Sequence, residues 1–408
     1  MHSLGKSKIN ILLLEGVHEK AVQSFERAGY KNIKYLAGAL EGDALEEALK
    51  NTHILGLRSR TQLTKNILEK APKLIAAGCF CIGTNQVDLI AAQAQGVPIF
   101  NAPFSNTRSV AELVIGETIL LMRGIPEKNA AIHKDGTWLK SAAGSFEVRG
   151  KTLGIVGYGH IGMQVATLAE NLGMNVIYYD IENKLSMGNA TPVNSLQELL
   201  TRADVVTLHV PQTEQTNNMI KGKELALMQE GSILINASRG TVVDINDLAD
   251  ALKTKHLKGA AIDVFPIEPS SKEEKLNSPL CGMPNTILTP HIGGSTKEAQ
   301  ENIALEVADK LIKYSDNGST LGAVNFAEVN LPSHKNCHRI LHVHVNKPGM
   351  LNALNDIFTF MGVNISAQYL QTKGNIGYVV TDIDDAGDNI DIARFKNLPG
   401  TIKARVLY

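Results

Sequence analysis

Three side chains in the second half of the sequence, Arg239, Glu268 and His291, have the types that oxidation of a hydroxy acid requires. Removal of a hydroxyl proton needs a base, and histidine has the side-chain pKa nearest to that task. A carboxylate on the second ring nitrogen orients the imidazole and raises its pKa, while a planar guanidinium binds a carboxylate. We therefore predict a base, its orienting acid and a substrate-binding cation. Each residue alone also fits a plain role: a core histidine, a solvated carboxylate or a surface salt bridge.

A GxGxxG turn built on Gly157, Gly159 and Gly162 predicts a dinucleotide site, because it follows the apolar run TLGIV and precedes a helical pattern. We expect the first glycine to allow the tight turn, the second to let the backbone approach a pyrophosphate, and the third to let helix and strand pack closely. Asp180 ends the next predicted strand, where a carboxylate accepts ribose hydroxyls and repels a 2′-phosphate, favouring NAD over NADP. A structural glycine turn with a solvated Asp180 is the alternative, and Lys184 is close enough in sequence to soften the exclusion of NADP.

The elements that must position these residues form an α/β unit that begins at KTLGIVGYG. Its six apolar runs, alternating with helical patterns, predict a doubly wound Rossmann sheet, with Arg239, Glu268 and His291 near the carboxyl ends of strands. The first hundred residues alternate in the same way and predict a second parallel sheet covered on both faces. Helical patterns over about 108–123 and 296–314 predict a connecting helix and one that returns to the first unit.

The last seventy residues predict a separate domain. An Asn-, Ser- and Gly-rich segment over 315–337 predicts a linker. Beyond it, the order strand, helix, strand, strand, helix, strand is that of a ferredoxin-like fold. Such a small core favours pairing with a second copy.

Length, charge and cysteine content exclude several classes of protein. The 408 residues predict two or three domains, and 40 Lys and Arg against 41 Asp and Glu leave no basic excess for nucleic acid. Without an apolar run of membrane-spanning length or an apolar stretch near the N-terminus, we expect a cytoplasmic protein and no membrane partner. Reduced, mostly buried thiols are expected at Cys79, Cys81, Cys281 and Cys337, whose spacing suits neither zinc nor a disulfide framework.

Several of these segments together resemble the D-2-hydroxyacid dehydrogenase family, in the form that carries a C-terminal ACT domain. The resemblance covers nearly the whole chain and rests on the glycine turn, Asp180, NASRG at 236–240, DVFPIEP at 263–269 and TPHIGG at 289–294. It implies a flavodoxin-like substrate domain made of residues 1–105 and 295–332, an NAD-binding domain at 106–294 and an ACT domain at 338–408. The implied catalytic set is Arg239, Glu268 and His291. The implied cofactor contacts, with the three glycines, are His160, Ile161, Asp180, Ala237, Ser238, Arg239, Asp263, His291, Gly293 and Gly294.

The resemblance further implies NAD-dependent oxidation of 3-phospho-D-glycerate to 3-phosphohydroxypyruvate, the first step of serine biosynthesis. A phosphate at the far end of the substrate needs further cations, and Arg58 and Arg60, flanking Ser59, project to one side if the chain is extended. Two solvated surface arginines are the alternative. Asn106 is a further candidate for the same site, next to His291 and Arg239. Another D-2-hydroxyacid dehydrogenase, acting on 2-hydroxyglutarate, glycerate or lactate, and an NADH-sensing corepressor remain alternative functions.

Two further segments predict contacts beyond one active site. Trp138 lies in an excursion that, by the resemblance, forms an arm to a neighbouring subunit of a homotetramer, although core packing also accounts for it. In the C-terminal domain, His344, Asn346 and Asn364 are the implied allosteric site for L-serine at a dimer interface. His342 and His344 alternate on one strand face, which suggests a metal site, but no third ligand has matching spacing nearby.

Overall fold

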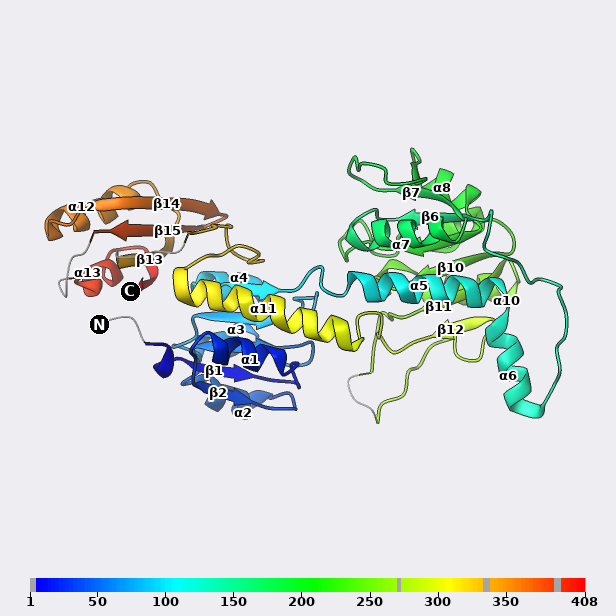
Figure 1. The fold of residues 1–408 in the computed structure, drawn as a ribbon, viewed down its shortest axis with the longest axis horizontal. Helices are drawn as coiled ribbons and strands as arrows, with labels where there is room; N and C mark the ends of the chain where they lie inside the picture. The colour runs from blue at the N-terminus through cyan, green and yellow to red at the C-terminus, as the bar shows by residue number, and fades with distance from the viewer. Residues whose placement is uncertain (1–4, 270–272, 333–337, 385–389, 408) are drawn as a thin grey trace. The chain divides into compact units, whose positions relative to one another are not determined.

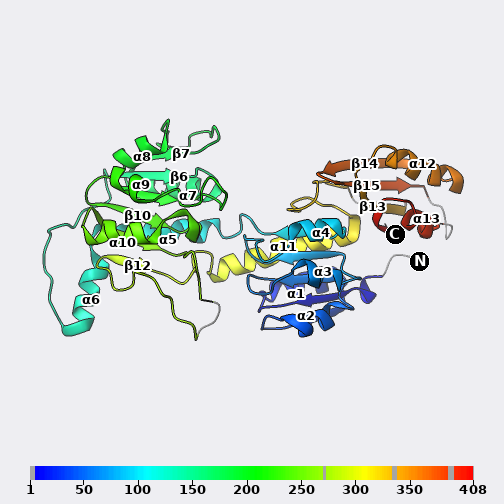
Figure 2. The same ribbon diagram turned by 180° about the vertical axis from the view of Figure 1, so that it is seen from behind.

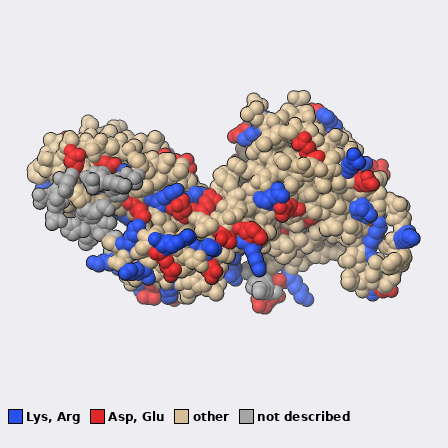
Figure 3. Space-filling view, in the orientation of Figure 1, with Lys and Arg blue, Asp and Glu red and all other residues tan. Residues whose placement is uncertain are grey.

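The computed structural model describes residues 5–269, 273–332, 338–384 and 390–407. The chain forms two compact units, Asn106–Ala299 and Met1–Ser105 with Gln300–Tyr408. The second of these includes the C-terminal domain. Figure 3 shows Lys and Arg side chains interspersed with Asp and Glu on the faces in view.

The unit Asn106–Ala299 is built on a fully parallel sheet of seven strands (Figure 1). From the first strand along the chain, Thr152–Val156, the later strands are added first on one side and then on the other. This is the topology of a doubly wound dinucleotide-binding sheet, and it confirms the predicted fold class. Beyond the six predicted strands there is a short seventh at one edge. In order across the sheet the strands are β12 (Thr286–Leu288), β11 (Leu257–Ile262), β10 (Ser232–Asn236), β9 (Val205–Leu208), β6 (Thr152–Val156), β7 (Asn175–Tyr179) and β8 (Thr191–Pro192).

Helices cover both faces of this sheet, as buried parallel strands require. One face carries two helices that pack on each other, α5 (Thr107–Met122) and α7 (His160–Asn171) (Figure 1). The other face, seen in Figure 2, carries α8 (Leu196–Arg202), α9 (Gly222–Leu227) and α10 (Ile245–Lys253). A further helix, α6 (Ile125–Asp135), projects from the edge of the unit and has no buried residue.

A second parallel sheet forms the N-terminal part of the other unit, with the flavodoxin-like order that the sequence implied. Its strands across the sheet are β2 (Asn32–Tyr35), β1 (Asn10–Leu13), β3 (Ile54–Leu57), β4 (Ala76–Cys79) and β5 (Ile99–Asn101). The covering helices are α1 (Lys20–Arg27), α2 (Gly42–Leu49), α3 (Lys65–Glu69), α4 (Leu89–Ala94) and α11 (Lys297–Asn317). The last of these packs Ile303, Val307 and Leu311 into the core, so the predicted return of this helix is confirmed.

The C-terminal domain is an antiparallel four-stranded sheet with its helices on one face, as the ferredoxin-like prediction required. Across the sheet the elements are β14 (Ile365–Lys373), β15 (Ile376–Ile383), β13 (His338–Val345) and β16 (Thr401–Leu407), covered by α12 (Met350–Met361) and α13 (Ile392–Lys396). The other face joins the core of the N-terminal sheet, in the same unit, through Leu341, Val343 and Tyr378. Beside this core, Arg339 and Asp382 form a buried bidentate ion pair at 2.6 and 2.7 Å.

Two expectations from composition need correction. α11 continues to Asn317, and residues 318–332 of the expected linker pack against the N-terminal sheet of the same unit. There the side chain of Asn325 accepts from the N–H of Ile99 and donates to the carbonyl of Val97, so polar residues satisfy a strand instead of forming a loose link. Residues 333–337, including Cys337, lie outside the described residues.

Cys79 is buried as expected, but Cys281 is exposed; all three described cysteines are free thiols. Among the described residues no helix has the length and apolar character of a membrane span.

Candidate active site

The glycine turn has the geometry that the sequence predicted. Gly157 adopts a φ of +92°, and a Cβ there would lie 2.5 Å from the carbonyl oxygen of His209. A Cβ on Gly162 would lie 2.3 Å from the carbonyl oxygen of Gly157, so the third glycine allows the close packing of helix on turn. A Cβ on Gly159, the residue before α7, would meet no atom within 4 Å. The middle glycine therefore faces open space at a helix N-terminus, which fits an approaching pyrophosphate.

Asp180 follows β7 beside this turn. Its carboxylate accepts hydrogen bonds from the backbone N–H of Tyr158 at 2.7 Å and of Glu182 at 2.9 Å. A carboxylate has about four acceptor positions, so two remain for ribose hydroxyls. Lys184 forms an ion pair with Glu182. The ammonium group that would favour a 2′-phosphate is therefore already paired with a carboxylate. His160 begins α7, and Ile161 in its first turn packs against the core formed by α5, α7 and the sheet.

His291 and Glu268 meet as the sequence predicted. The imidazole Nδ1 lies 3.0 Å from Glu268 Oε2, and the backbone N–H of Phe265 donates to Glu268 Oε1 at 3.2 Å. Both side chains reach solvent, with 53% and 38% of their surfaces exposed. Neither is a core residue, so the plain role considered for His291 is excluded. The hydrogen bond at Nδ1 leaves Nε2 as the nitrogen that can face a substrate.

Electrostatics prepares this pair for proton transfer. The hydrogen bond to Glu268 raises the pKa of His291 above its ordinary value; burial opposes this, while the charges of Glu268 and Asp263 add to it and Arg239 lowers it. Burial alone would raise the pKa of Glu268, but the bond from His291, the N–H of Phe265 and the charge of Arg239 hold it below its ordinary value. The acid is therefore ionised at neutral pH and stabilises an imidazolium on His291.

Asp263, expected at the cofactor, also holds the histidine loop in place. Its buried carboxylate accepts from Thr289 Oγ1 at 2.6 Å and from the N–H groups of Ile292 and Gly293, both at 2.8 Å. Its backbone carbonyl accepts from the N–H of His291 at 2.8 Å. These bonds stabilise His291 at a φ of +54°, a left-handed conformation that residues other than glycine rarely adopt. Sequence spacing gave no signal of this role.

Arg239 leaves the carboxyl end of β10 and is half-buried, with its Nη1 donating to the carbonyl of Ser238 at 2.7 Å. The preceding Ser238 donates from Oγ to Asn236 Oδ1 at 2.8 Å, while Ala237 is half-buried. A Cβ on Gly240 would lie 2.0 Å from the backbone of Phe265, so the arginine turn packs directly against the segment that carries Glu268. The structure thus brings Arg239, Glu268 and His291 into one electrostatic site.

Sequence reasoning missed Glu117, a buried acid on α5 with only 3% of its surface exposed. Burial, together with the smaller effect of the charge of Asp263, raises the pKa of Glu117 to about 8. It is therefore mainly protonated at neutral pH and adds no negative charge beneath Asp263. A single acid inside the apolar stretch LVIGETILLM was the signal that could have identified it.

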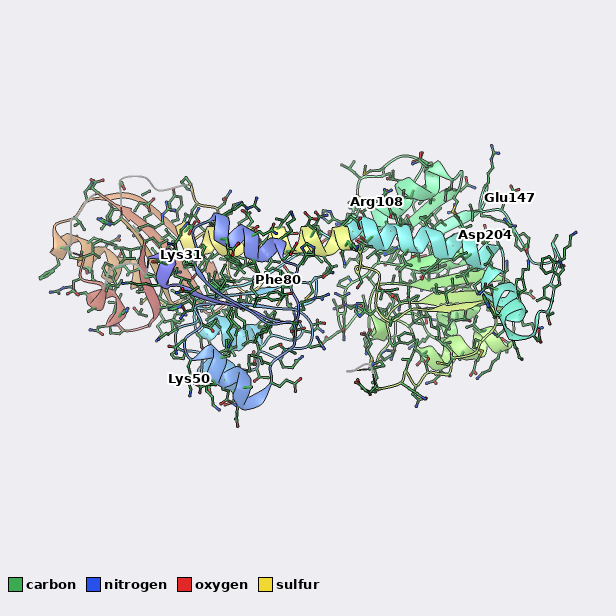
Figure 4. The ribbon with its side chains drawn as sticks, turned by 60° about the horizontal axis from the view of Figure 1, so that its bottom comes forward. Lys31, Lys50, Phe80, Arg108, Glu147 and Asp204 are labelled. Atoms are coloured by element: carbon green, nitrogen blue, oxygen red, sulfur yellow. The ribbon has the colours of Figure 1, made fainter. Side chains whose placement is uncertain are left out.

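Asn106, before α5, is buried against the other end of the histidine loop, since a Cβ on Gly294 would lie 2.3 Å from Asn106 Nδ2. Asn106 Oδ1 is buried without a hydrogen-bond partner among the described residues. Arg108, labelled in Figure 4, instead forms an ion pair at 2.6 Å with Glu112 on its own helix. Of these two, Asn106 is the better candidate for a site residue.

Arg58, Ser59 and Arg60 directly follow β3 in the other unit, at the carboxyl edge of its sheet. Arg58 is half-buried, whereas Ser59 and Arg60 are exposed. Their backbone is held by the buried Glu15, which accepts from the N–H groups of Arg58 at 3.1 Å and Arg60 at 2.9 Å. No pattern in the sequence indicated this acid.

The segment after α6 exposes apolar side chains, and Trp138 has 77% of its surface exposed, which excludes core packing within the chain. Ile132, Leu139 and Phe146 are exposed by 43–47%. Figures 1 and 2 both show α6 and this segment extending from the edge of their unit. An exposed group of this kind is typical of a surface that another protein covers.

The three candidate allosteric residues do not converge in one chain. His344 and Asn346 lie at the end of β13 that pairs with Ile376, whereas Asn364 precedes the end of β14 that pairs with Ile383. Seven residues of extended chain, about 20 Å, separate the two ends. One small ligand cannot contact all three within a single copy.

His342 and His344 lie on the helix-covered face of the C-terminal sheet. His342 Nε2 is 2.8 Å from Thr401 Oγ1, and the two Nδ1 atoms are 3.3 Å apart. Burial lowers the pKa of His342 to about 4, helped by the charge of its neighbour, and burial also lowers the pKa of His344. Both are therefore neutral at neutral pH. Within the described parts of the chain no group of three potential ligands forms a metal site.

Comparison with known proteins agrees with this geometry. Residues 115–293 match the model of the D-isomer specific 2-hydroxyacid dehydrogenase NAD binding domain, and residues 340–403 match an AHAS small subunit-like ACT domain. The D-3-phosphoglycerate dehydrogenase of Escherichia coli K12 is 62% identical over 408 residues, covering 100% of this chain and 99% of the relative, and that of Haemophilus influenzae is 61% identical over 100% and 99%.

Among solved structures, a D-lactate dehydrogenase from Aquifex aeolicus complexed with NAD and lactic acid superposes with a TM-score of 0.64 at 27% identity, covering 75% of this chain and 95% of that one. The part of this chain outside that match leaves room for the additional C-terminal domain. With full-length relatives of this identity, the chain belongs to the D-3-phosphoglycerate dehydrogenases of the D-isomer specific 2-hydroxyacid dehydrogenase family.

Proposed function

We propose that the protein oxidises 3-phospho-D-glycerate to 3-phosphohydroxypyruvate with NAD, as the first step of serine biosynthesis. The hydrogen bond between His291 Nδ1 and Glu268 Oε2 carries the proposal, because it makes an exposed imidazole into an oriented base beside a carboxylate-binding arginine. The choice of 3-phospho-D-glycerate as the substrate rests on the full-length relatives, which are named D-3-phosphoglycerate dehydrogenases.

In this reaction neutral His291 removes the hydroxyl proton through Nε2, and Glu268 stabilises the imidazolium that results. NAD, when bound, supplies the acceptor for the hydride. In the reverse direction the imidazolium returns the proton to the carbonyl oxygen. Arg239 binds the α-carboxylate through its planar guanidinium and polarises the oxygen on the neighbouring carbon.

The residues around the glycine turn suit NAD. Gly159 opens the N-terminus of α7 to the pyrophosphate, and Asp180 keeps acceptor positions for the ribose. Asp263, Gly293 and the segment 236–238 supply the remaining cofactor contacts. The phosphate of the substrate binds Arg58 and Arg60, and Asn106 and Ser59 contribute hydrogen bonds to the substrate.

The direct test measures initial rates of NAD reduction with 3-phospho-D-glycerate, D-glycerate, D-lactate and D-2-hydroxyglutarate. We expect kcat/KM to be highest for the phosphorylated acid. A higher value for one of the other three acids would support a different dehydrogenase of the same family. No turnover with any of them, together with NADH-dependent change in oligomeric size, would support the corepressor alternative.

We also propose that the C-terminal domain binds L-serine as a feedback inhibitor between two copies of the chain. Because His344 and Asn346 lie at the opposite end of the sheet from Asn364, a two-fold related copy is required to bring Asn364 beside them. A second interface forms through the exposed segment around Trp138, and two different two-fold interfaces on one chain make a tetramer.

This assembly has a test of its own. Serine should inhibit the purified enzyme, and the Asn364→Ala variant should lose inhibition without loss of basal activity. Light scattering should give the mass of a tetramer for the native chain and of a smaller species for Trp138→Glu. A monomer with full serine inhibition would contradict the shared site.

A further inference from the structure

We propose that Glu15 is a positioning residue for substrate phosphate: its buried carboxylate holds the loop 58–61 in the shape that presents Arg58 and Arg60. The inference rests on the proposed function, in which these two arginines bind that phosphate. Nothing in the reaction itself requires an acid at this place.

Glu15 is an unusual residue in its own surroundings. It is the second residue after β1, has 4% of its surface exposed, and adopts a φ of +62° in the left-handed region. Its backbone N–H donates to the carbonyl of Gly38 at 2.9 Å. Burial of a carboxylate costs free energy, and so does a left-handed backbone in any residue other than glycine. The surrounding contacts must therefore offset both costs.

Those contacts come from one loop. The N–H groups of Arg58 and Thr61 donate to Glu15 Oε1 at 3.1 and 2.9 Å, and the N–H of Arg60 donates to Oε2 at 2.9 Å. Three of four consecutive residues thus point their amides at one carboxylate. Burial alone would raise the pKa of Glu15, but these three backbone bonds, together with the side chain of Thr61, hold the pKa below the ordinary value.

A second buried side chain holds the same loop from its carbonyl side. Gln86, with 5% of its surface exposed, donates from Nε2 to the carbonyl oxygen of Arg58 at 2.6 Å. The loop is therefore fixed through both its amides and a carbonyl. Loops held in this way present their side chains with little loss of conformational entropy on binding.

The arrangement determines how an anion can be bound here. Because Glu15 takes the amides of Arg58, Arg60 and Thr61, these groups are turned inward and cannot form a backbone cradle for phosphate. The guanidinium groups are the part of the loop left to bind an anion. The side chain of Arg60 is 58% exposed, and its Nε lies 3.9 Å from Glu15 Oε2. Phosphate recognition in this loop therefore depends on the guanidinium groups of Arg58 and Arg60, and Glu15 positions the backbone that carries them.

The test is Glu15→Gln, which keeps the size of the side chain but replaces one acceptor oxygen with an amide donor, so that at least one of the N–H groups of Arg58, Arg60 and Thr61 loses its acceptor. We expect KM for 3-phospho-D-glycerate to rise about 10-fold or more, because displacing a binding group by about 1 Å costs up to about 100-fold. The kcat at saturation, the KM for NAD and the Kd for NADH should each stay within about 2-fold. The exposed Glu69→Gln, in the same unit, is the matched control and should leave all four constants unchanged.

Two comparisons separate positioning from a general structural role. For D-glycerate, which has no phosphate, kcat/KM should change less than about 2-fold in Glu15→Gln. In a background lacking both arginines (Arg58→Ala with Arg60→Ala), adding Glu15→Gln should raise KM no further, since acid and arginines act through one contact. Equal losses for both acids, or independent effects in the triple variant, would overturn the inference.

The outcomes also distinguish this inference from the proposed function. If removal of both arginines leaves KM for the phosphorylated acid unchanged, the assignment of the phosphate site fails, and the inference fails with it. If removal raises KM but folded Glu15→Gln behaves as the native enzyme, only the inference fails. Should Glu15→Gln not bind NADH because it does not fold, Glu15→Asp, which keeps the charge but shortens the reach, should raise KM for the phosphorylated acid alone; a native KM there overturns the inference.

Discussion

Replacement of Glu268 by glutamine should slow oxidation of the hydroxy acid and lower the pH at which oxidation becomes active. Oxidation needs neutral His291, so its rate rises with pH as this group loses its proton, and the reverse reduction falls over the same range. In the native protein Glu268 raises the pKa of His291. An amide stabilises the imidazolium less, so the histidine loses its proton at lower pH and both inflections move toward acid.

The size of the rate effect follows from the geometry of the pair. The transition state develops positive charge on His291, whose Nδ1 is 3.0 Å from the carboxylate. Two charges about 4 Å apart interact by about 1 kcal/mol in water and about 4 kcal/mol at an effective dielectric constant of 20. Because both side chains are partly exposed, with 53% and 38% of their surfaces accessible, we take about 2 kcal/mol. This corresponds to a loss of about 30-fold in kcat.

The assay is a pH profile of kcat and kcat/KM in both directions for the native enzyme and Glu268→Gln. The half-buried Glu198→Gln, whose partner is Arg202 in the same unit, is the matched control and should reproduce the native profile. NADH binding should remain unchanged in both variants. A native kcat with an unmoved inflection in Glu268→Gln would refute the role of this acid.

Three further predictions concern the cofactor, stability and regulation. Asp180→Ala should lower the preference for NAD over NADP, as the ratio of kcat/KM values, by about 10-fold or more, since a charged hydrogen bond contributes about 1.5–3 kcal/mol; an unchanged ratio would remove Asp180 from the ribose site. Asp382→Ala leaves the buried Arg339 unpaired and should destabilise the protein by about 3–5 kcal/mol in urea unfolding, whereas loss of the exposed Asp309 should cost less than about 1 kcal/mol; equal effects would contradict the buried pair. His344→Ala should abolish binding of serine by calorimetry without loss of kcat, and native affinity would place serine elsewhere.

The sequence predicted the parts of the fold that depend on periodicity. Short apolar runs alternating with helical patterns predict a parallel sheet buried on both faces. Gly157 and Gly162, between such a run and a helical pattern, predict the tight turn that the structure contains. The pairing of His291 with Glu268 was also predictable, because both follow strands whose carboxyl ends share one edge of the sheet.

The sequence could not predict contacts that depend on exact backbone geometry. Glu15 lies 43 residues before Arg58, and no periodicity links a single acid to the amides of a distant loop. Asp263 was recognisable as a cofactor residue, but its bonds to the histidine loop depend on a left-handed turn at His291. Composition was similarly misleading over 318–332, where the polar Asn325 forms hydrogen bonds with the backbone of Ile99 in β5 and of Val97, two residues before that strand.

The most direct test of the central claim is a comparison of His291→Ala with the native enzyme in two measurements on the same preparation. NADH binding, followed by fluorescence, should be retained, while the rate of NAD reduction with 3-phospho-D-glycerate should fall by about 100-fold or more, as loss of a general base requires. Near-native turnover in a variant that binds NADH normally would contradict the account of His291 as the base.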